Sequence, residues 1–350
     1  MNESAVRCGV IGVGRMGRHH ARVYATMKGA ALVGVVDLNA DAARAIADEW
    51  GGEAFGSVEQ LLDAGVDAVT IATPTVHHRP AAETLLQRKI ACLIEKPLAP
   101  SAAEARAIAD LAEAHNAVLQ VGHIVRYDPV MRAIMGIRGG DRGGIRGRFI
   151  EMDRVSPMTF RSVDVGVVLD MMIHDLDLLL MLVGAEPEQV HASAVCVLGE
   201  AEDVCNARLE FPPAAGGDGY RAVANITASR LALKTERKLR IISEDMYVSA
   251  DFVARKGQVV RKTANEQQLA ELRQRLKAGE DLTNLNYLDL VEVEELKVEP
   301  GDALELQIAD FLSAVREGRR PTIDAQAGFA AVRTAERIVE AARAAGARMV

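Results

Sequence analysis

A lysine ends an apolar run in the stretch ACLIEKPLAP, which covers residues 91–100. Lys96 follows Glu95 directly and Pro97 comes next, so a rigid bend can aim the charged side chain. The bond from Lys96 to Pro97 is also among the few peptide bonds that can be cis at modest cost. A cation aimed in this way could stabilise negative charge that develops on a substrate oxygen. A solvent-facing charge that merely ends a strand is an equally good interpretation of the Lys-Pro pair alone.

A second chemical signal lies near the start of the chain, in GVIGVGRMG at residues 9–17. Gly12, Gly14 and Gly17 form the pattern G-x-G-x-x-G between an expected strand and an expected helix, where the backbone can approach a pyrophosphate. Asp37 follows about 20 residues later, at the end of the next expected strand, where its carboxylate can accept hydrogen bonds from a ribose diol. The same carboxylate would repel a 2′-phosphate, and the next two residues, Leu38 and Asn39, supply no compensating arginine. The pattern therefore favours NAD over NADP.

The third signal is VLDMMIHDLDLLL at residues 168–180. Asp170 and His174 stand four residues apart and Asp177 stands three further on, so in a helix all three project from roughly one side. The rest of this helix is apolar, and burying a polar strip unpaired would cost several kcal/mol, so the strip should face a cavity, a partner or water. The ordinary pKa of histidine, about 6.5, suits proton exchange at neutral pH. A surface ion pair between Asp170 and His174 is the structural alternative.

The first third of the chain alternates apolar strands with helical patterns. The expected strands are residues 6–12, 31–37, 67–73, 90–96 and 117–123. Strands that are apolar on both faces and alternate with helices indicate an α/β Rossmann domain, a doubly wound parallel sheet covered by helices on both sides. The stretch ATPTVHH at residues 72–78 and Lys96 then lie at the carboxyl ends of strands, which is the edge where such sheets bind ligands.

After residue 124 strands follow one another without alternating helices, which predicts an α+β domain with a large open antiparallel sheet. One helical stretch, residues 164–182, interrupts early. Residues 262–300 are ambiguous: the first half has a helical composition, while LNYLDLVEVEELKVE could be a strand. Two amphipathic helices close the chain. We therefore expect an NAD-binding domain at residues 1–124 and a domain for substrate binding and oligomerisation at residues 125–350, with the C-terminal helix packing back on the first domain.

Composition excludes several classes of partner. The chain has 350 residues and a formal net charge of −8, which argues against nucleic-acid or anionic-membrane binding, because phosphate binding needs clustered positive charge. The N-terminus carries Glu3 and no basic leader, and the longest apolar stretch is too short to cross a bilayer. The four cysteines form no C-x-x-C pair, as expected of buried thiols in a cytoplasmic protein. We expect no metal site, because the His-His pairs at 19–20 and 77–78 are sequential neighbours that project differently.

Together these residues resemble the Gfo/Idh/MocA family, that of glucose-fructose oxidoreductase and inositol 2-dehydrogenase. The resemblance rests on GVIGVGRMG, Asp37, the E-K-P of residues 95–97, and the D-x-x-x-H of Asp170 and His174, and it spans nearly the whole chain. Only the combination is specific. The resemblance implies that Lys96 and His174 flank the substrate carbinol in a cleft between the Rossmann domain and the open sheet.

One stretch, VGHIVRYDPVMR at residues 121–132, departs from the form G-F-N-x-R-F-x-P that is common in sugar and inositol dehydrogenases, with His123 in place of the usual asparagine. This stretch, together with residues 162–179 and the LNYLDL of 285–290, resembles the branch that acts on UDP-N-acetylglucosamine or its uronate. That branch oxidises the sugar at C3. The departure argues against inositol or free glucose as the substrate.

The resemblance and the chemistry together assign roles. His174 is the expected base, Asp170 orients its ring and favours the imidazolium, and Lys96 stabilises the developing alkoxide. The expected cofactor-binding residues are Gly12, Gly14, Arg15, Met16, Gly17, Asp37, Thr73, Pro74, His77, Glu95, Lys96 and Pro97. The expected substrate-binding residues are Lys96, His123, Arg126, Arg161, Asp170 and His174. Arg126, Arg154, Arg161 and Arg230 are candidates for binding a diphosphate, although each could be an ordinary surface arginine.

Two other functions compete with this interpretation. A regulator that senses NAD without catalysis would be expected to lose the E-K-P lysine or the helix histidine, and both remain. An enzyme of the same fold could instead act on a polyol such as inositol, a free sugar or a trans-dihydrodiol. In either case the antiparallel sheet has one face to cover, and its apolar alternation predicts a homodimer or homotetramer.

Overall fold

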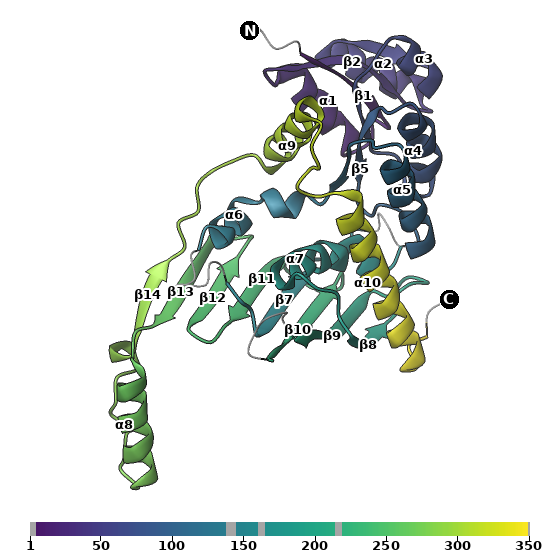
Figure 1. Ribbon diagram of the computed structural model, residues 1–350. Helices are drawn as coiled ribbons and strands as arrows, with labels where there is room; N and C mark the ends of the chain where they lie inside the picture. Colours follow the sequence, from purple (N-terminus) through teal and green to yellow (C-terminus); the bar gives the residue numbers. More distant parts are fainter. Residues whose placement is uncertain (1–4, 138–144, 160–164, 214–218, 349–350) are drawn as a thin grey trace.

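The computed structural model describes residues 5–137, 145–159, 165–213 and 219–348. Two sheets lie one above the other, with helices between them and along one side (Figure 1). The N-terminal sheet has six strands in the order β3-β2-β1-β4-β5-β6, and all neighbouring strands are parallel. Its strands are β1 (Val6–Ile11), β2 (Ala30–Val36), β3 (Glu53–Phe55), β4 (Ala68–Ile71), β5 (Ala91–Glu95) and β6 (Leu119–Gly122). The order reverses between β1 and β4, where doubly wound sheets bind ligands.

Helices cover both faces of this sheet, as the alternating pattern predicts. They are α1 (Gly17–Thr26), α2 (Ala40–Trp50), α3 (Val58–Asp63), α4 (His78–Gln87) and α5 (Ala102–Ala114). Separate apolar clusters lie on the two faces. Side chains cap several of these helices, since Asn39 accepts from the amides of Asp41 and Ala42 and Ser101 accepts from the amide of Glu104. Such caps satisfy amide groups that have no partner within the helix.

The second sheet has eight strands in the order β14-β13-β12-β11-β7-β10-β9-β8. They are β7 (Phe149–Val155), β8 (Gln189–Val195), β9 (Val204–Pro213), β10 (Arg221–Ser229), β11 (Glu236–Ile242), β12 (Met246–Asp251), β13 (Lys256–Lys262) and β14 (Val291–Glu295). The sheet is antiparallel, as expected, except for the central pair β7 and β10. A long connection that includes a helix separates these two strands, which is what parallel pairing requires.

One face of the second sheet is covered and the other is open. The covered face packs against α6 (Pro129–Met135), α7 (Ile173–Val183) and α10 (Ala325–Ala344), and the three helices share one apolar core with the strands (Figure 1). Across the open face polar side chains pair between strands: Arg240 donates to Glu151 and Asn206 donates to Thr227. The open face is therefore mixed rather than apolar.

The ambiguous segment after β13 forms α8 (Glu266–Lys277), a short 3₁₀ turn (Tyr287–Asp289) and β14. The expectation of a helix in the first half is confirmed, whereas the expected strand shortens to the five residues of β14. None of the residues of α8 is buried, and the helix extends away from the rest of the molecule (Figure 1).

The chain then returns to the first sheet. Helix α9 (Ala303–Glu317) contributes Leu304, Ile308 and Phe311 to the apolar cluster beneath β1 and α1. The last helix, α10, packs against α5 on one side and against α7 and β8 on the other. The C-terminal helices thus join the two layers. No helix in the described part of the chain combines the length and apolar character needed to cross a bilayer.

Candidate active site

Glycine occupies each of the three positions of the turn after β1 for a different physical reason. Gly12 has φ +85°, and a Cβ there would lie 2.8 Å from the Ala72 carbonyl oxygen and the Thr73 nitrogen. A Cβ on Gly17 would lie 1.8 Å from the carbonyl oxygen of Gly12. A Cβ on Gly14, by contrast, would meet nothing within 4 Å. Packing therefore demands glycine at 12 and 17, while Gly14 leaves its backbone open to an approaching ligand.

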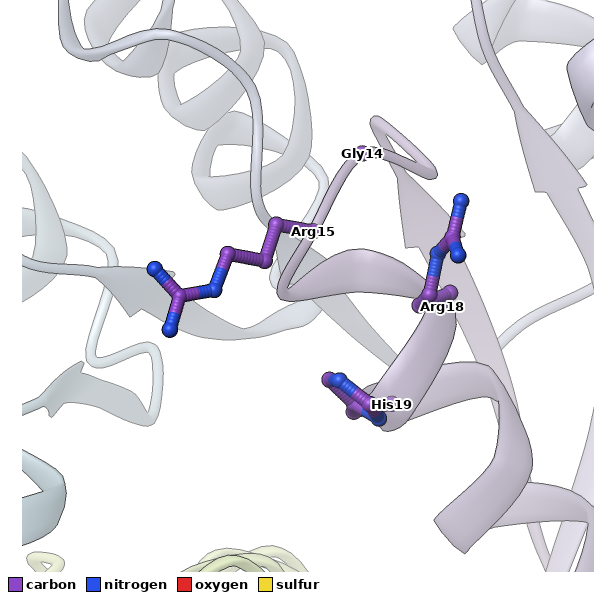
Figure 2. Close-up of a pocket in the computed structure, with 4 residues that line it drawn as sticks. All are labelled: Gly14, Arg15, Arg18 and His19. Atoms are coloured by element: carbon purple, nitrogen blue, oxygen red, sulfur yellow. The ribbon is translucent and has the colours of Figure 1, made fainter. Parts of the chain in front are cut away.

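An open hollow of about 400 Å³ adjoins this turn and is lined by Gly14, Arg15, Arg18 and His19 (Figure 2). Helix α1 begins here with no side-chain cap and no acidic residue in its first turn. Uncapped amide groups at a helix N-terminus carry partial positive charge and bind phosphate. The turn, the uncapped helix and the open Gly14 fit the pyrophosphate of NAD.

Asp37 stands beside the glycine turn. Its carboxylate accepts hydrogen bonds from the amides of Val13 and Asn39, both at 2.8 Å. Each carboxylate oxygen can accept a second hydrogen bond, so the group can still bind a ribose diol. The two amide contacts hold the Asp37 carboxylate beside the glycine turn, which is the position that the motif predicts.

The E-K-P segment at the end of β5 is tied to α1 through buried polar residues. The His20 Nε2 atom lies 2.9 Å from a carboxylate oxygen of Glu95, and the other ring nitrogen lies 3.3 Å from the hydroxyl of Thr70. That hydroxyl in turn contacts Tyr24 at 2.7 Å. Burial alone would raise the pKa of Glu95, but the hydrogen bond and charge of His20, together with Lys96, lower it below its ordinary value. Glu95 is therefore a buried anion that fixes the position of the neighbouring lysine.

His78 fixes the other side of this segment. Its Nδ1 atom lies 3.1 Å from the carbonyl oxygen of Pro97, and its Nε2 atom lies 3.0 Å from the carbonyl oxygen of Thr73. Burial lowers the pKa of His78. The Lys96–Pro97 peptide bond is cis, as the sequence allowed. Of the histidine pair at 77–78, the sequence favoured His77 as a cofactor contact, but it is His78 that joins the two loops, while His77 is exposed.

Lys96 reaches from the first sheet to the helix of the second layer. Its Nζ atom donates to the backbone carbonyl of Asp170 at 2.7 Å and lies 3.4 Å from the carboxylate of the same residue. Asp170 belongs to a π-helical turn (Val168–Met172) directly before α7. Such turns are frequent at functional sites.

The sequence predicts that Asp170 orients the ring of His174, whereas in the structure its carboxylate contacts Lys96 and no hydrogen bond joins the described residues Asp170 and His174. The shorter of the two contacts to Lys96 Nζ comes from the backbone carbonyl of Asp170 in the π-helical turn, and the longer one comes from its carboxylate. Asp170 thus positions the lysine rather than the imidazole.

His174 lies on the first turn of α7. Within the described residues its ring makes no hydrogen bond, and its Nδ1 atom is buried. Burial, followed by the positive charges of Lys96 and Arg154, holds the pKa of His174 well below its ordinary value. The imidazole is consequently neutral at pH 7, able to accept a proton, and close enough to Lys96 to feel its charge.

Three arginines that were candidates for a diphosphate are instead paired with carboxylates inside the protein. Arg126 forms a bidentate pair with Asp177 (2.7 and 2.6 Å). Arg154 does the same with Asp175 (2.8 and 2.6 Å). Arg230 donates to Asp203 and to the carbonyl oxygen of Val165. These pairs are largely buried rather than on the surface, so the three guanidinium groups hold the fold together. Arg161, the fourth candidate, lies outside the described residues.

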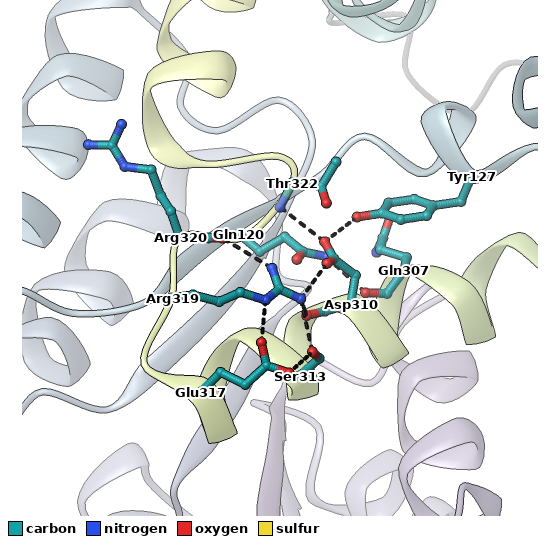
Figure 3. A network of polar contacts seen from close by, with 9 residues as sticks. All are labelled: Gln120, Tyr127, Gln307, Asp310, Ser313, Glu317, Arg319, Arg320 and Thr322. Atoms are coloured by element: carbon teal, nitrogen blue, oxygen red, sulfur yellow. Dashed lines mark hydrogen bonds and ion pairs between the residues drawn. The ribbon is translucent and has the colours of Figure 1, made fainter. Parts of the chain in front are cut away.

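The segment with His123 and Arg126 is anchored from the C-terminal part of the chain (Figure 3). Asp310 on α9 accepts hydrogen bonds from the Tyr127 hydroxyl (2.8 Å) and the Thr322 amide (3.0 Å). His123 itself is 1% exposed and neither ring nitrogen has a hydrogen-bond partner in the described chain. Burial lowers its pKa. It lies beneath the site, beside Asp177, and not on an open surface.

Sequence reasoning missed three residues of this region: His20, His78 and Arg237. The histidines were visible only as sequential pairs. Arg237 is the second residue of β11 and precedes by two positions Leu239, which is buried. Since side chains alternate along a strand, Arg237 is a charge on the core-facing side, and that alternation was the available signal.

Comparison with known proteins identifies relatives along the whole chain. Residues 6–123 match the NAD-binding Rossmann fold of the GFO/IDH/MocA oxidoreductase family, and residues 144–248 match a C-terminal domain of the same family. A UDP-N-acetylglucosamine 3-dehydrogenase of Acidithiobacillus ferrooxidans is 36% identical over 92% of this chain and 93% of its own. An inositol 2-dehydrogenase of Rhizobium meliloti is 34% identical over 56% of this chain and 60% of its own.

Solved structures agree. The UDP-N-acetylglucosamine 3-dehydrogenase from Acidithiobacillus ferrooxidans superposes with a TM-score of 0.82 at 35% identity, over 97% of this chain and 98% of that one. A levoglucosan dehydrogenase in complex with NADH and levoglucosan superposes with a TM-score of 0.77 at 18% identity, over 97% and 98% of the two chains, which shows a shared fold.

Proposed function

The chain belongs to the GFO/IDH/MocA oxidoreductase family, and from this premise we propose that it oxidises a secondary alcohol of a nucleotide sugar. The family binds NAD through its Rossmann domain, and the chain is an NAD-dependent dehydrogenase acting on a CH–OH group. The proposed substrate is UDP-N-acetylglucosamine or its uronate, oxidised at C3. The observation that carries this choice is the 36% identity to a UDP-N-acetylglucosamine 3-dehydrogenase, which covers 92% of the chain and so includes both sheets. The inositol 2-dehydrogenase match covers 56%.

Gly14, the N-terminus of α1 and Asp37 would hold the cofactor, with the backbone of Arg15 and Met16 and with Thr73, Pro74 and His77 as further proposed contacts. When bound, NAD supplies the acceptor for the hydride that leaves the substrate carbon. The chain itself handles the proton. His174, neutral because of its lowered pKa, accepts the hydroxyl proton, and the Lys96 ammonium stabilises the oxygen as negative charge develops on it.

Lys96 can do this because its position is fixed from three directions. The Asp170 carbonyl accepts one of its three donor hydrogens, Glu95 is held by His20, and His78 holds the following proline. A donor hydrogen of the ammonium group therefore remains for the substrate oxygen. We propose residues 1–124 as the cofactor half of the molecule and residues 125–350 as the half that binds substrate and associates with other copies.

Label transfer tests the substrate and the position together. UDP-N-acetylglucosamine carrying deuterium at C3 is incubated with the enzyme and NAD, and the NADH formed is analysed by mass spectrometry. We expect deuterated NADH, and unlabelled NADH from substrate deuterated at any other carbon. A parallel panel with the uronate, myo-inositol and glucose follows NADH absorbance. Turnover of inositol, with none of the nucleotide sugars oxidised, would reject the proposed substrate. NADH binding without turnover of any alcohol would favour a sensor instead.

We also propose self-association through the open face of the second sheet, as a homodimer or homotetramer. Helices cover only the opposite face, and partly buried side chains such as Phe149 and Tyr247 lie among the polar pairs of the open one. Light scattering of the purified chain should give a dimer or tetramer mass, and a monomer would contradict the proposal.

The four free cysteines support a cytoplasmic enzyme, since reduced thiols are typical of that compartment.

A further inference from the structure

Arg237 occupies an unusual place for a charged side chain. In the register of the second sheet it pairs with Arg154 of β7. Leu239 and Ile241, two and four residues further along β11, are buried in the core under the helices. Because side chains alternate along a strand, Arg237 points to the same covered face. That is the face that also carries α7 and His174.

Arg237 has no anionic partner in the described part of the chain. Its side chain is exposed to solvent and makes no hydrogen bond or ion pair with the described residues. The nearby carboxylate of Asp175 is already engaged, since both of its oxygens accept from Arg154. Partial desolvation of the guanidinium, and then the positive charge of Arg154, lower the pKa of Arg237, while the carboxylates of Asp175 and Asp128 act in the opposite direction. The guanidinium is thus open to solvent beside a second positive charge, and the Asp175 carboxylate is already paired.

A second guanidinium approaches from the other layer. Arg15 follows Gly14 in the glycine turn, is exposed, and makes no hydrogen bond in the described chain. Its side chain points away from Arg18, to the other side of the turn (Figure 2). The charge of Arg15 acts on Arg237, and the charge of Arg237 acts on His174. Arg237 therefore acts on the proposed base, and the charge of Arg15 reaches Arg237 from the glycine turn of the other sheet.

We propose that Arg237, assisted by Arg15, binds the diphosphate of the nucleotide-sugar substrate. The fork of a guanidinium matches the oxygens of a phosphate and can bind them in a bidentate manner. A diphosphate brings the negative charge that the two arginines lack, and the attached sugar then lies next to Lys96 and His174. A neutral polyol would leave both cations without a counter-ion. This inference rests on the proposed function and names the residues that select its substrate class.

The test compares Arg237→Gln with Arg240→Gln. Arg240 lies on the same strand but on the open face, where it pairs with Glu151. We expect Arg237→Gln to raise the KM for UDP-N-acetylglucosamine about ten- to a hundredfold, the loss typical of a charge-assisted hydrogen bond. Arg237→Lys should fall between this variant and the wild type, because it keeps the charge and loses the fork. Arg240→Gln should leave KM unchanged, and the Kd of NADH, measured by fluorescence titration, should be unchanged in all three variants.

Calorimetric titration of the NADH-loaded enzyme with UDP extends the comparison. UDP should bind the wild type and Arg240→Gln alike and bind Arg237→Gln at least tenfold more weakly. Oxidation of UDP-N-acetylglucosamine with a wild-type KM in Arg237→Gln would overturn this inference and leave the proposed function intact. An equal loss of NADH affinity would assign Arg237 to the cofactor and also overturn it. A wild-type enzyme that binds NADH but neither UDP nor UDP-N-acetylglucosamine would contradict the proposed function, and this inference with it.

Discussion

Replacing Gly14 by alanine and replacing Gly17 by alanine each add one methyl group to the same turn. The two variants should have opposite effects on stability and on cofactor affinity. At Gly17 the new Cβ would lie 1.8 Å from the carbonyl oxygen of Gly12, far inside van der Waals contact. The start of α1 would have to move relative to β1. At Gly14 the new Cβ would meet nothing within 4 Å and would enter the space in which a pyrophosphate approaches the backbone.

The two effects can be separated by measuring both stability and cofactor affinity. Overpacking a tight site costs about 1–3 kcal/mol or more, and a backbone clash at 1.8 Å belongs at the upper end. At about 2 °C per kcal/mol for a large chain, Gly17→Ala should lower Tm by about 6 °C. Gly14→Ala should melt within a degree or so of the wild type but bind NADH about tenfold more weakly in a fluorescence titration. Equal losses of Tm in the two variants, or wild-type NADH binding by Gly14→Ala, would refute this interpretation of the turn.

The remaining predictions concern the catalytic groups and the buried histidines. Lys96→Ala and His174→Ala should each lower kcat about 10²- to 10⁴-fold with the Kd of NADH unchanged; near-normal turnover in both variants would contradict their roles. Asp170→Asn should cost much less than Lys96→Ala, because the shorter contact to Lys96 Nζ comes from the Asp170 carbonyl (2.7 Å) and survives the change; an equal loss would mean that the carboxylate itself takes part. Burial lowers the pKa values of His78, His123 and His174 below that of the unfolded chain, about 6.5. The unfolded state therefore binds protons first, and the free energy of unfolding, measured with urea, should fall as pH drops below about 6.5; a rise would show that the buried rings are charged.

Much of the fold could be predicted from sequence because its signals are local. Strands apolar on both faces and separated by helices indicate a parallel sheet wherever they occur. The position of Lys96 beside the glycine turn follows from the same topology, since carboxyl ends of parallel strands share one edge. The contact between Lys96 and the helix of His174 came from the family resemblance, because no local pattern joins residues so far apart.

The parts that were missed depend on geometry that spacing does not encode. The carboxylate of Asp170 contacts Lys96, which follows a distant strand, rather than His174, its neighbour in the sequence pattern. Two of the arginine candidates, Arg126 and Arg154, pair with carboxylates of α7. The sequence of that helix gives no indication of which distant arginines will face them. The sequence of strand β13, KGQVVRK, gives only a weak strand signal, because it has two strongly apolar residues between charged ends. Its place in the sheet comes from pairing with β12 and β14.

The return of α9 to the first sheet has a consequence for how the chain is made. The strands and helices of the cofactor layer leave the ribosome early, yet Leu304, Ile308 and Phe311 complete one of their apolar clusters. Until those residues emerge, part of that layer remains uncovered to solvent, and a fragment that stops at residue 124 would expose the same surface permanently. The core of the cofactor half is therefore completed only after the chain has been synthesised as far as α9, close to the C-terminus.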